Sequence, residues 1–183
     1  AKLFIHPTTP CIACSPGENQ SAATRATPLA KYPNPMLEFF FDTARSVTDL
    51  FLMGVVRAHP SITFIIPHAG GCLPPIMERF SGFASAVPDA AIDKSVTRAT
   101  VLEALKRQFY FDMAGFSFPG QIKGLLEVCE VEKGRLLYGS DYPFTPASAV
   151  ERMAGVMDEG TEGWGDGERG KAYFENAREL LGE

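Results

Sequence analysis

The sequence predicts an α/β fold built from parallel βα units. Four short apolar runs lack polar alternation, as strands buried on both faces do, and they alternate with longer segments of helical spacing. Strands that alternate with helices form parallel sheets with right-handed crossovers. Three of the runs lead into a polar side chain, namely His6, His68 and Asp141. The carboxyl ends of parallel strands lie at one edge of the sheet, where active and ligand-binding sites are found. We therefore expect these three residues to lie close together.

The composition is that of an ordinary globular domain. The 183 residues are 45% hydrophobic and 21% charged, with a net charge of −5, which fits one domain. The acidic balance argues against a nucleic-acid or anionic-membrane partner, and no apolar run approaches the roughly 20 residues of a membrane span. Four cysteines do not suggest a disulfide scaffold, so we expect a reducing, cytoplasmic setting. The chain opens directly in a strand without Met, as expected for the middle of a larger fold.

The first strand is predicted over residues 2–6 and is stopped by Pro7. Residues 8–35 are rich in Thr, Pro, Ser and Ala, and we expect them to form a long loop over the site. This loop carries Cys11 and Cys14 in a C-x-x-C pattern, which can be a redox motif or half of a zinc site. Since no second C-x-x-C follows, we interpret both as ordinary loop thiols.

Apolar residues at helical spacing over 36–58 predict a long amphipathic helix that ends near Gly54–His59 and is closed by Pro60. His59, next to that proline, is interpreted as a helix-end side chain and not as a ligand. The remaining strands are predicted at 62–66, 109–113 and 136–139, and the remaining helices at 73–86, 96–107, 119–130, 147–157 and 168–181. An eight-stranded barrel takes about 250 residues, so four such units do not close one.

Four segments together carry a resemblance to a known family. They are FIHP at 4–7, FIIPHAGG at 64–71, FYFD at 109–112 and LYGSDYPF at 137–144. In this order they resemble the second half of the amidohydrolase-related family, and within it the metal-dependent decarboxylases of aminocarboxymuconate semialdehyde, γ-resorcylate and 6-methylsalicylate. The resemblance implies a TIM-type (β/α)8 barrel whose last four βα units form residues 1–183 as a single domain.

The resemblance also implies roles for individual residues. His6 and Asp141 would be metal ligands, and His68 would be the catalytic acid or base beside the metal-bound water, with Asp141 counted as catalytic as well. Arg79 stands eleven residues after His68, where the semialdehyde decarboxylases have an arginine that binds substrate carboxylate across a dimer interface; a solvated helix arginine is the alternative. The expected cofactor is a divalent metal, zinc ahead of manganese. Asp112 is interpreted as a supporting or structural carboxylate.

The implied activity is non-oxidative decarboxylation of a small aromatic or enol-type carboxylic acid. Two alternatives remain: a metal-dependent hydrolase of an amide, lactone or ester, and a non-catalytic barrel remnant that acts as an interaction module. The family's first strand supplies two further ligands in an H-x-H or E-x-H pair, and this sequence contains no H-x-H. We therefore expect the chain to be incomplete alone and to work as part of a longer enzyme, with a separate N-terminal half, or as a homodimer.

Overall fold

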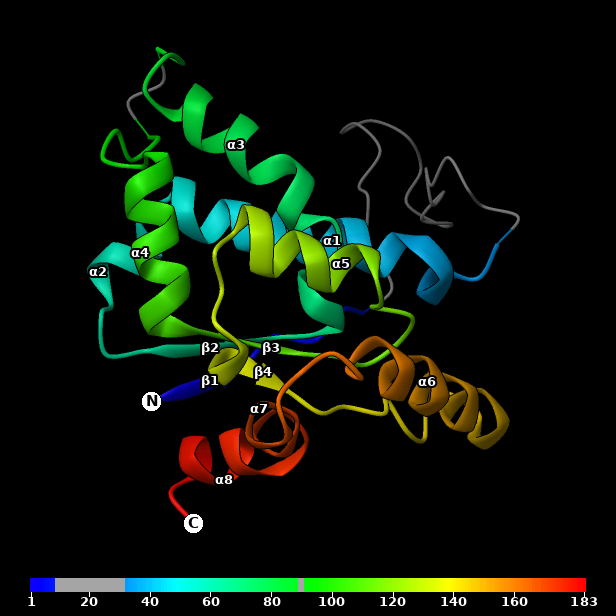
Figure 1. Cartoon of the computed structure of the whole chain (residues 1–183). Coiled ribbons are helices and arrows are strands. Elements are labelled where there is room, and N and C mark those ends of the chain that lie inside the picture. The colour runs from blue at the N-terminus through cyan, green and yellow to red at the C-terminus, as the bar shows by residue number, and fades with distance from the viewer. Residues whose placement is uncertain (9–31, 89–90) are drawn as a thin grey trace.

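A four-stranded parallel sheet in the order β1-β2-β3-β4 forms the centre of the computed structural model (Figure 1), which describes residues 1–8, 32–88 and 91–183. The strands are β1 (Lys2–Phe4), β2 (Thr63–Ile66), β3 (Phe109–Asp112) and β4 (Leu136–Leu137). The order in the sheet follows the order in the chain, as expected for successive βα units. The predicted α/β fold is therefore confirmed. Cys11, Cys14 and most of the predicted loop over 8–35 lie outside the described residues.

Helices flank the sheet on both sides. They are α1 (Asn34–Leu52), α2 (Val55–Ala58), α3 (Leu73–Ala84), α4 (Arg98–Gln108), α5 (Gly120–Lys123), α6 (Ala147–Gly160), α7 (Asp166–Gly170) and α8 (Asn176–Leu181), with shorter helical turns η1 (His68–Gly70), η2 (Gly124–Val128), η3 (Lys133–Arg135) and η4 (Lys171–Glu175). In Figure 1, α1, α3, α4 and α5 lie above the sheet, while α7 and α8 lie below it. Among the described residues, no helix combines the length and the apolar character that a membrane span requires.

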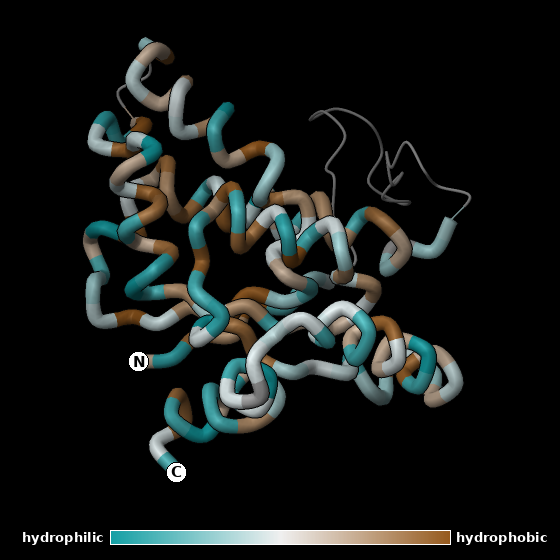
Figure 2. Tube along the Cα trace, in the orientation of Figure 1, coloured by the Kyte–Doolittle hydropathy of each residue, from teal (hydrophilic) through white to brown (hydrophobic). Residues whose placement is uncertain are grey.

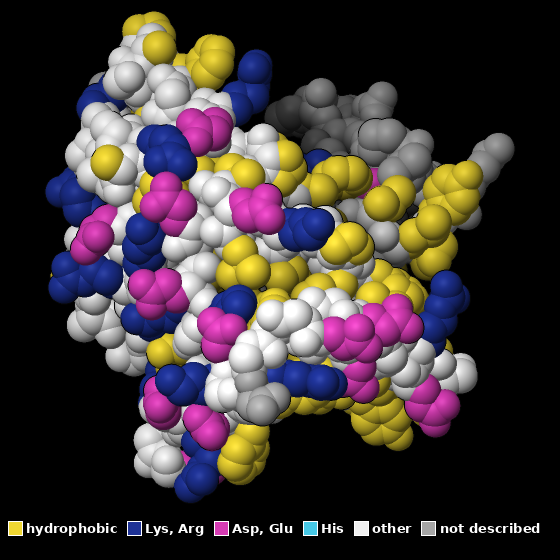
Figure 3. Space-filling view, viewed as in Figure 1, with side chains coloured by type: hydrophobic (Ala, Val, Ile, Leu, Met, Phe, Trp, Pro, Cys, Tyr) yellow, Lys and Arg dark blue, Asp and Glu magenta, His cyan; other side chains and the backbone are white. Residues whose placement is uncertain are grey.

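The core lies between the sheet and the helices above it. Phe109 of β3 is fully buried and stacks on Phe64 of β2 and on Phe51 of α1, at centroid distances of 5.0 and 5.5 Å. The covering helices alternate hydrophobic and hydrophilic residues along their turns (Figure 2), so each presents an apolar side to these rings. On the face that Figure 3 presents, Lys/Arg and Asp/Glu side chains are interspersed, with no large patch of one sign. The aromatic side chains of β2 and β3 thus pack against the helices above the sheet.

The predicted long helix is present as α1 but does not continue to residue 58, because the chain breaks at Gly54, within the range 54–59 expected for its end. This glycine has a φ of 71°, in the left-handed region, and separates α1 from α2. The break is held from outside the helix: the backbone N–H of Asp93 donates to the carbonyl of Leu52 at 2.7 Å. A Cβ at position 54 would lie 3.0 Å from Oδ2 of Asp93. Only glycine combines this backbone with so close a neighbour.

The helix predicted over residues 96–107 begins slightly later, at Arg98. Thr97 caps it, since its Oγ1 accepts from the backbone N–H of Thr100, and the Thr100 hydroxyl oxygen accepts from the backbone N–H of Thr97. This reciprocal pair satisfies two otherwise unpaired donors and sets the start of α4. The end of α4 then leads without a loop into β3.

The outer edge of β4 is covered by the C-terminal helical segment. The Asn176 side-chain amide donates to the carbonyl of Leu136 at 2.8 Å, and the backbone N–H of Tyr138 donates to the carbonyl of Ala172 at 2.9 Å. On the opposite side of β4, the carbonyl of Leu137 accepts from Met113, next to β3. The segment η4–α8 therefore occupies the side of β4 that faces away from the sheet.

Candidate metal and acid–base site

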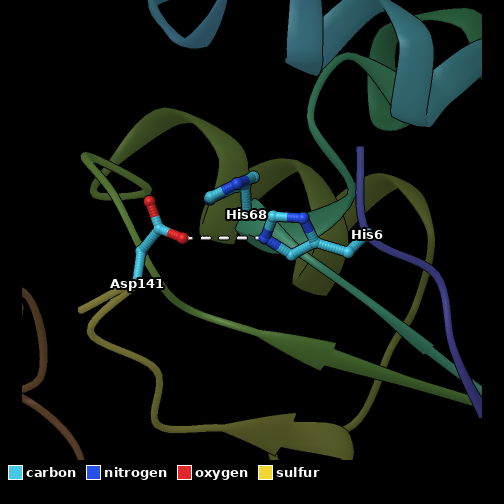
Figure 4. Close-up of side chains that lie close together, drawn as sticks. All are labelled: His6, His68 and Asp141. Atoms are coloured by element: carbon cyan, nitrogen blue, oxygen red, sulfur yellow. Dashed lines mark ion pairs between the residues drawn. The ribbon is translucent and has the colours of Figure 1, made fainter. Parts of the chain in front are cut away.

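Three side chains converge at the carboxyl ends of the strands (Figure 4). His6 follows β1, His68 follows β2 and Asp141 follows β4. One ligand atom from each lies within 4.8 Å of the others, an arrangement that could hold a metal ion. The three residues that the sequence predicts to meet do meet, although their individual roles stay predictions.

The His6 ring is oriented by its own chain. Its Nδ1 lies 2.9 Å from the carbonyl of Pro7. Because a carbonyl only accepts, Nδ1 must be the donor, and the lone pair of neutral His6 is then on Nε2. That nitrogen lies 3.6 Å from Oδ1 of Asp141. In metal sites, a hydrogen bond at the ring nitrogen that does not bind the metal fixes the tautomer of the ligating histidine in this way.

Asp141 is fixed from both its side chain and its backbone. The Thr145 hydroxyl donates to Oδ2 of Asp141 at 2.8 Å, and the Thr145 backbone N–H donates to the carbonyl of Asp141 at the same distance. Asp141 itself has a φ of 57°, a conformation that Asp tolerates better than most side chains. With Oδ2 engaged, Oδ1 is the oxygen that faces His6. The sequence reasoning missed Thr145; a hydroxyl residue four positions after the aspartate is the available signal.

His68 is buried, with 7% of its surface exposed, in a turn of unusual backbone. Both His68 and the following Ala69 have φ values near 50°, at 51° and 50°. The His68 backbone N–H donates to Oδ1 of Asp112 at 2.9 Å, and its Nδ1 lies 3.4 Å from the carbonyl of Ala114. Phe40 stacks on the ring at a centroid distance of 5.5 Å. The imidazole is thus held on one face and at one nitrogen.

Asp112 lies beneath His68 at the end of β3. Burial raises the pKa of its carboxyl, against the opposing effect of the hydrogen bonds from the backbone N–H groups of His68 and Ala114. The Asp112 side chain faces the same cavity as the three clustered residues. It is therefore part of the site, as the sequence interpretation of a supporting carboxylate allows.

A cavity of about 380 Å³ opens above these residues. Exposed aromatic side chains form much of its wall, with Phe4, Tyr142 and Phe144 beside the clustered residues, and Leu180 and Leu181 of the C-terminal helix on the far side. The Phe144 ring is 82% exposed and lies 5.9 Å from the ring of His6. This volume suits a small ligand, and the wall suits an aromatic one.

Arg79 does not line this cavity. It is exposed on α3, where its guanidinium lies 4.9 Å from the ring centroid of Phe83. Within one chain the structure therefore does not bring Arg79 to the site. A role across an interface stays a prediction. His59, at the end of α2, does not line the cavity either, in agreement with its interpretation as a helix-end residue.

Comparison with known proteins assigns the family. The model of the amidohydrolase family matches residues 4–182, so the chain belongs to this family. A 6-methylsalicylic acid decarboxylase of Aspergillus aculeatus is 30% identical over 183 residues, which are 99% of this chain and 50% of that protein. The chain thus spans about half the length of such relatives, in agreement with four of the eight βα units of a TIM-type barrel.

Two solved structures agree with this fold. An amidohydrolase II is 27% identical, with a TM-score of 0.75, and the match covers all of this chain and 52% of that one. A 5-carboxyvanillate decarboxylase of Novosphingobium aromaticivorans, solved with manganese and 4-hydroxy-3-methoxy-5-nitrobenzoic acid, has a TM-score of 0.72 at 20% identity. That match covers 98% of this chain and 47% of the other. The resemblance to the amidohydrolase-related family is confirmed.

The turn that carries His68 depends on Gly71, and alanine there should be costly. Gly71 has a φ of 57°, and a Cβ would lie 2.5 Å from the carbonyl oxygen of Phe40. With a ψ of −119°, Gly71 lies outside the left-handed helical region, in a conformation that glycine adopts far more readily than other residues. Gly71→Ala should lower the free energy of unfolding by ~1–3 kcal/mol for the strained backbone plus a further ~1–3 kcal/mol for the overlap. Gly182→Ala is the control for a positive φ alone, because its φ is 83° and nothing lies near its missing Cβ. A loss in urea denaturation no larger than that of Gly182→Ala would contradict this prediction.

Proposed function

We propose that the enzyme to which this chain contributes is a metal-dependent decarboxylase of a small aromatic carboxylic acid. The observation that carries the proposal is the convergence of two imidazoles and a carboxylate on a cavity with an aromatic wall. It is supported by membership of the amidohydrolase family and by relatives named as decarboxylases. The hydrolase and interaction-module alternatives are less favoured, because neither is suggested by those relatives.

The donor set fits a divalent cation. Imidazole and carboxylate suit zinc and manganese alike, and His6 and Asp141 would hold the ion with the atoms that their hydrogen bonds leave available, Nε2 and Oδ1. The sequence-based preference for zinc finds no support in the manganese-containing neighbour. We propose Mn²⁺ and Zn²⁺ as equal candidates. When bound, such a cation supplies a Lewis acid that binds acid oxygens and stabilises negative charge.

His68 would carry out the proton transfer. Decarboxylation of an aromatic acid replaces the carboxyl group by hydrogen, so the ring carbon must gain a proton while its bond to CO2 breaks and returns the electron pair to the ring. His68 lines the cavity, and imidazole is the side chain most often used to transfer a proton to or from a reacting group. The exposed rings of Phe4 and Phe144 would contact the substrate ring. Arg79 remains a candidate for a substrate carboxylate across an interface.

With His68 assigned to proton transfer, His6 and Asp141 are two ligands, which is short of the three protein ligands usual for a catalytic zinc site. We propose that the remaining ligands come from further βα units, either in a longer protein or separate chain, or from a second copy of this chain in a homodimer. Exposure of all three residues of β1 supports such a contact, since open strand edges favour pairing. A cytoplasmic location and the absence of nucleic-acid and membrane partners stay predictions.

The test is a measurement of CO2 release by the protein loaded in turn with Mn²⁺ and Zn²⁺. 6-Methylsalicylate and 2,6-dihydroxybenzoate are suitable probes. Each is assayed with this chain alone and with the chain joined to the further βα units proposed above. Loss of CO2 with formation of the corresponding phenol would support the proposal. Hydrolysis of amide, lactone or ester probes by the loaded protein without CO2 release would contradict it, as would binding of neither metal in any form of the chain.

Metal binding should depend strongly on Asp141. Asp141→Asn should weaken the affinity for Mn²⁺ or Zn²⁺ by more than about 100-fold, beyond the ~10–100-fold expected of Thr145→Val, which removes only the hydroxyl that donates to Asp141. The amide keeps the size of the side chain and an oxygen for the Thr145 hydroxyl, but it loses the negative charge. Titration calorimetry measures the affinities, with His59→Gln as the control that should not change them. Unchanged affinity in Asp141→Asn would place the ion elsewhere.

A further inference from the structure

The carboxylate of Asp112 makes contacts that go beyond filling the space under the site. Asp112 is 8% exposed and stands at the last position of β3. Its Oδ1 accepts two hydrogen bonds, from the backbone N–H of His68 at 2.9 Å and from that of Ala114 at 3.0 Å. The two donors belong to the loops after neighbouring strands β2 and β3. One oxygen therefore ties the ends of both strands together.

The first of these bonds acts on the backbone of His68. Non-glycine residues with positive φ carry backbone strain, and two occur in succession at His68 and Ala69. The hydrogen bond from the His68 N–H to Oδ1 of Asp112 holds this turn against that strain.

The second bond acts on the imidazole through Ala114. When the Ala114 N–H is held by Asp112, the Ala114 carbonyl is directed at Nδ1 of His68, 3.4 Å away. A carbonyl cannot donate, so this contact favours the neutral tautomer with the proton on Nδ1. Nε2 is then unprotonated on the side of the ring away from Ala114.

The surroundings leave little freedom for another arrangement. A Cβ on Gly139 would lie 3.3 Å from Cβ and Cγ of Asp112, so the absence of a side chain there makes room for the carboxylate. Phe40 stacks on the imidazole and limits its rotation. A Cβ on Gly115 would lie 3.6 Å from Nδ1 of His68, on the same side as Ala114.

We propose that Asp112 is a positioning residue, which holds the His68 turn and the Ala114 carbonyl so that neutral His68 carries its proton on Nδ1 and presents an unprotonated Nε2 to the cavity. The value of this tautomer to catalysis rests on the proposed function of His68 in proton transfer. The tautomer itself does not depend on the proposed function, because it is a property of the chain without metal or substrate.

The test is the tautomer of His68, measured by long-range ¹H–¹⁵N spectra of the full 183-residue chain labelled at histidine. The chain has three histidines, so His6→Gln and His59→Gln assign the three rings. Under alkaline conditions in which the ¹⁵N shifts show the His68 ring to be neutral, wild-type His68 should be mainly the Nδ1–H form. In Asp112→Ala the Nε2–H form should become the major population. Asp112→Asn, whose amide oxygen can still accept both N–H groups, should restore the wild-type pattern.

A folded Asp112→Ala chain in which His68 remains mainly Nδ1–H would overturn the proposal. If that variant does not fold, Gly139→Ala replaces it, because the added methyl would press on Asp112 and on the Ala114 side chain, the two residues whose contact orients the Ala114 carbonyl. The Nε2–H population should then rise, while Gly134→Ala, whose Cβ would meet nothing within 4 Å, leaves it unchanged. An unaltered tautomer in Gly139→Ala would equally reject the proposal. Failure to detect decarboxylation would count against the proposed function and leave the tautomer result standing.

Discussion

Replacing His68 by glutamine is expected to lower the rate of CO2 release by the metal-loaded enzyme about 10²–10⁴-fold, the range for loss of a general acid or base. Glutamine is of similar length and can keep the contact with Phe40, but it cannot transfer a proton at neutral pH. Since the lost interaction belongs to the transition state, kcat should fall with little change in KM. Steady-state assays of CO2 release against substrate concentration measure both constants.

The matched control is His59→Gln, which removes an imidazole that does not line the cavity. It should leave kcat and KM unchanged. Metal content must be measured on both variants, because His68 lies within the donor cluster. If His68→Gln retained full kcat with full metal content, the ring carbon would have to receive its proton from another group, and the proposed role of His68 would be wrong.

Phe109→Ala should be the most destabilising substitution in the apolar layer, lowering the free energy of unfolding by about 3–5 kcal/mol, as for large-to-small changes at buried aromatics. The ring is fully buried and makes stacked contacts with Phe51, Phe64 and Phe111. Its removal leaves a cavity that rings on three sides cannot readily fill. Urea denaturation followed by circular dichroism measures the loss.

Phe144→Ala serves as the comparison, because it deletes the same ring at a site where 82% of the residue is exposed. Its effect on stability should stay within about 0.5 kcal/mol. A small loss of unfolding free energy for Phe109→Ala would mean that the helices above the sheet can move to fill the cavity left by the ring. A large loss for Phe144→Ala would mean that this ring is covered in solution.

The sequence predicts the sheet and its covering helices because their signals are local. Unbroken apolar runs such as Phe109–Asp112 indicate buried strands, and helical spacing indicates the segments between them. The break at Gly54 is different in kind. A glycine inside a helical pattern costs only about 1 kcal/mol, so the pattern continues through it. The contact that decides the break comes from Asp93, nearly forty residues away, and no local signal contains it.

The same distinction holds at the site. His6, His68 and Asp141 could be predicted to converge because each follows a strand, and strand ends share one edge of a parallel sheet. Their supporting contacts were not visible in the sequence. Asp112 acts on backbone N–H groups, which every residue type possesses, and the left-handed turn at His68 has glycines only after it, not at the histidine itself. Such contacts follow from the folded arrangement alone.

The two borders of the sheet differ in how they would receive another strand. At β1, residues 1 and 5 bond to β2 through Thr63 and Ile65, so by the alternation of a parallel ladder the peptide groups of Lys2 and Phe4 point outward. At β4, an added strand would first have to displace the Asn176 amide and the Ala172 carbonyl. Each of them makes one hydrogen bond with β4 or the residue after it, and each bond has a net value of about 1 kcal/mol. A further strand can therefore be added more easily at β1, the N-terminal edge of the sheet, than at β4, the C-terminal edge, where two hydrogen bonds must first be broken.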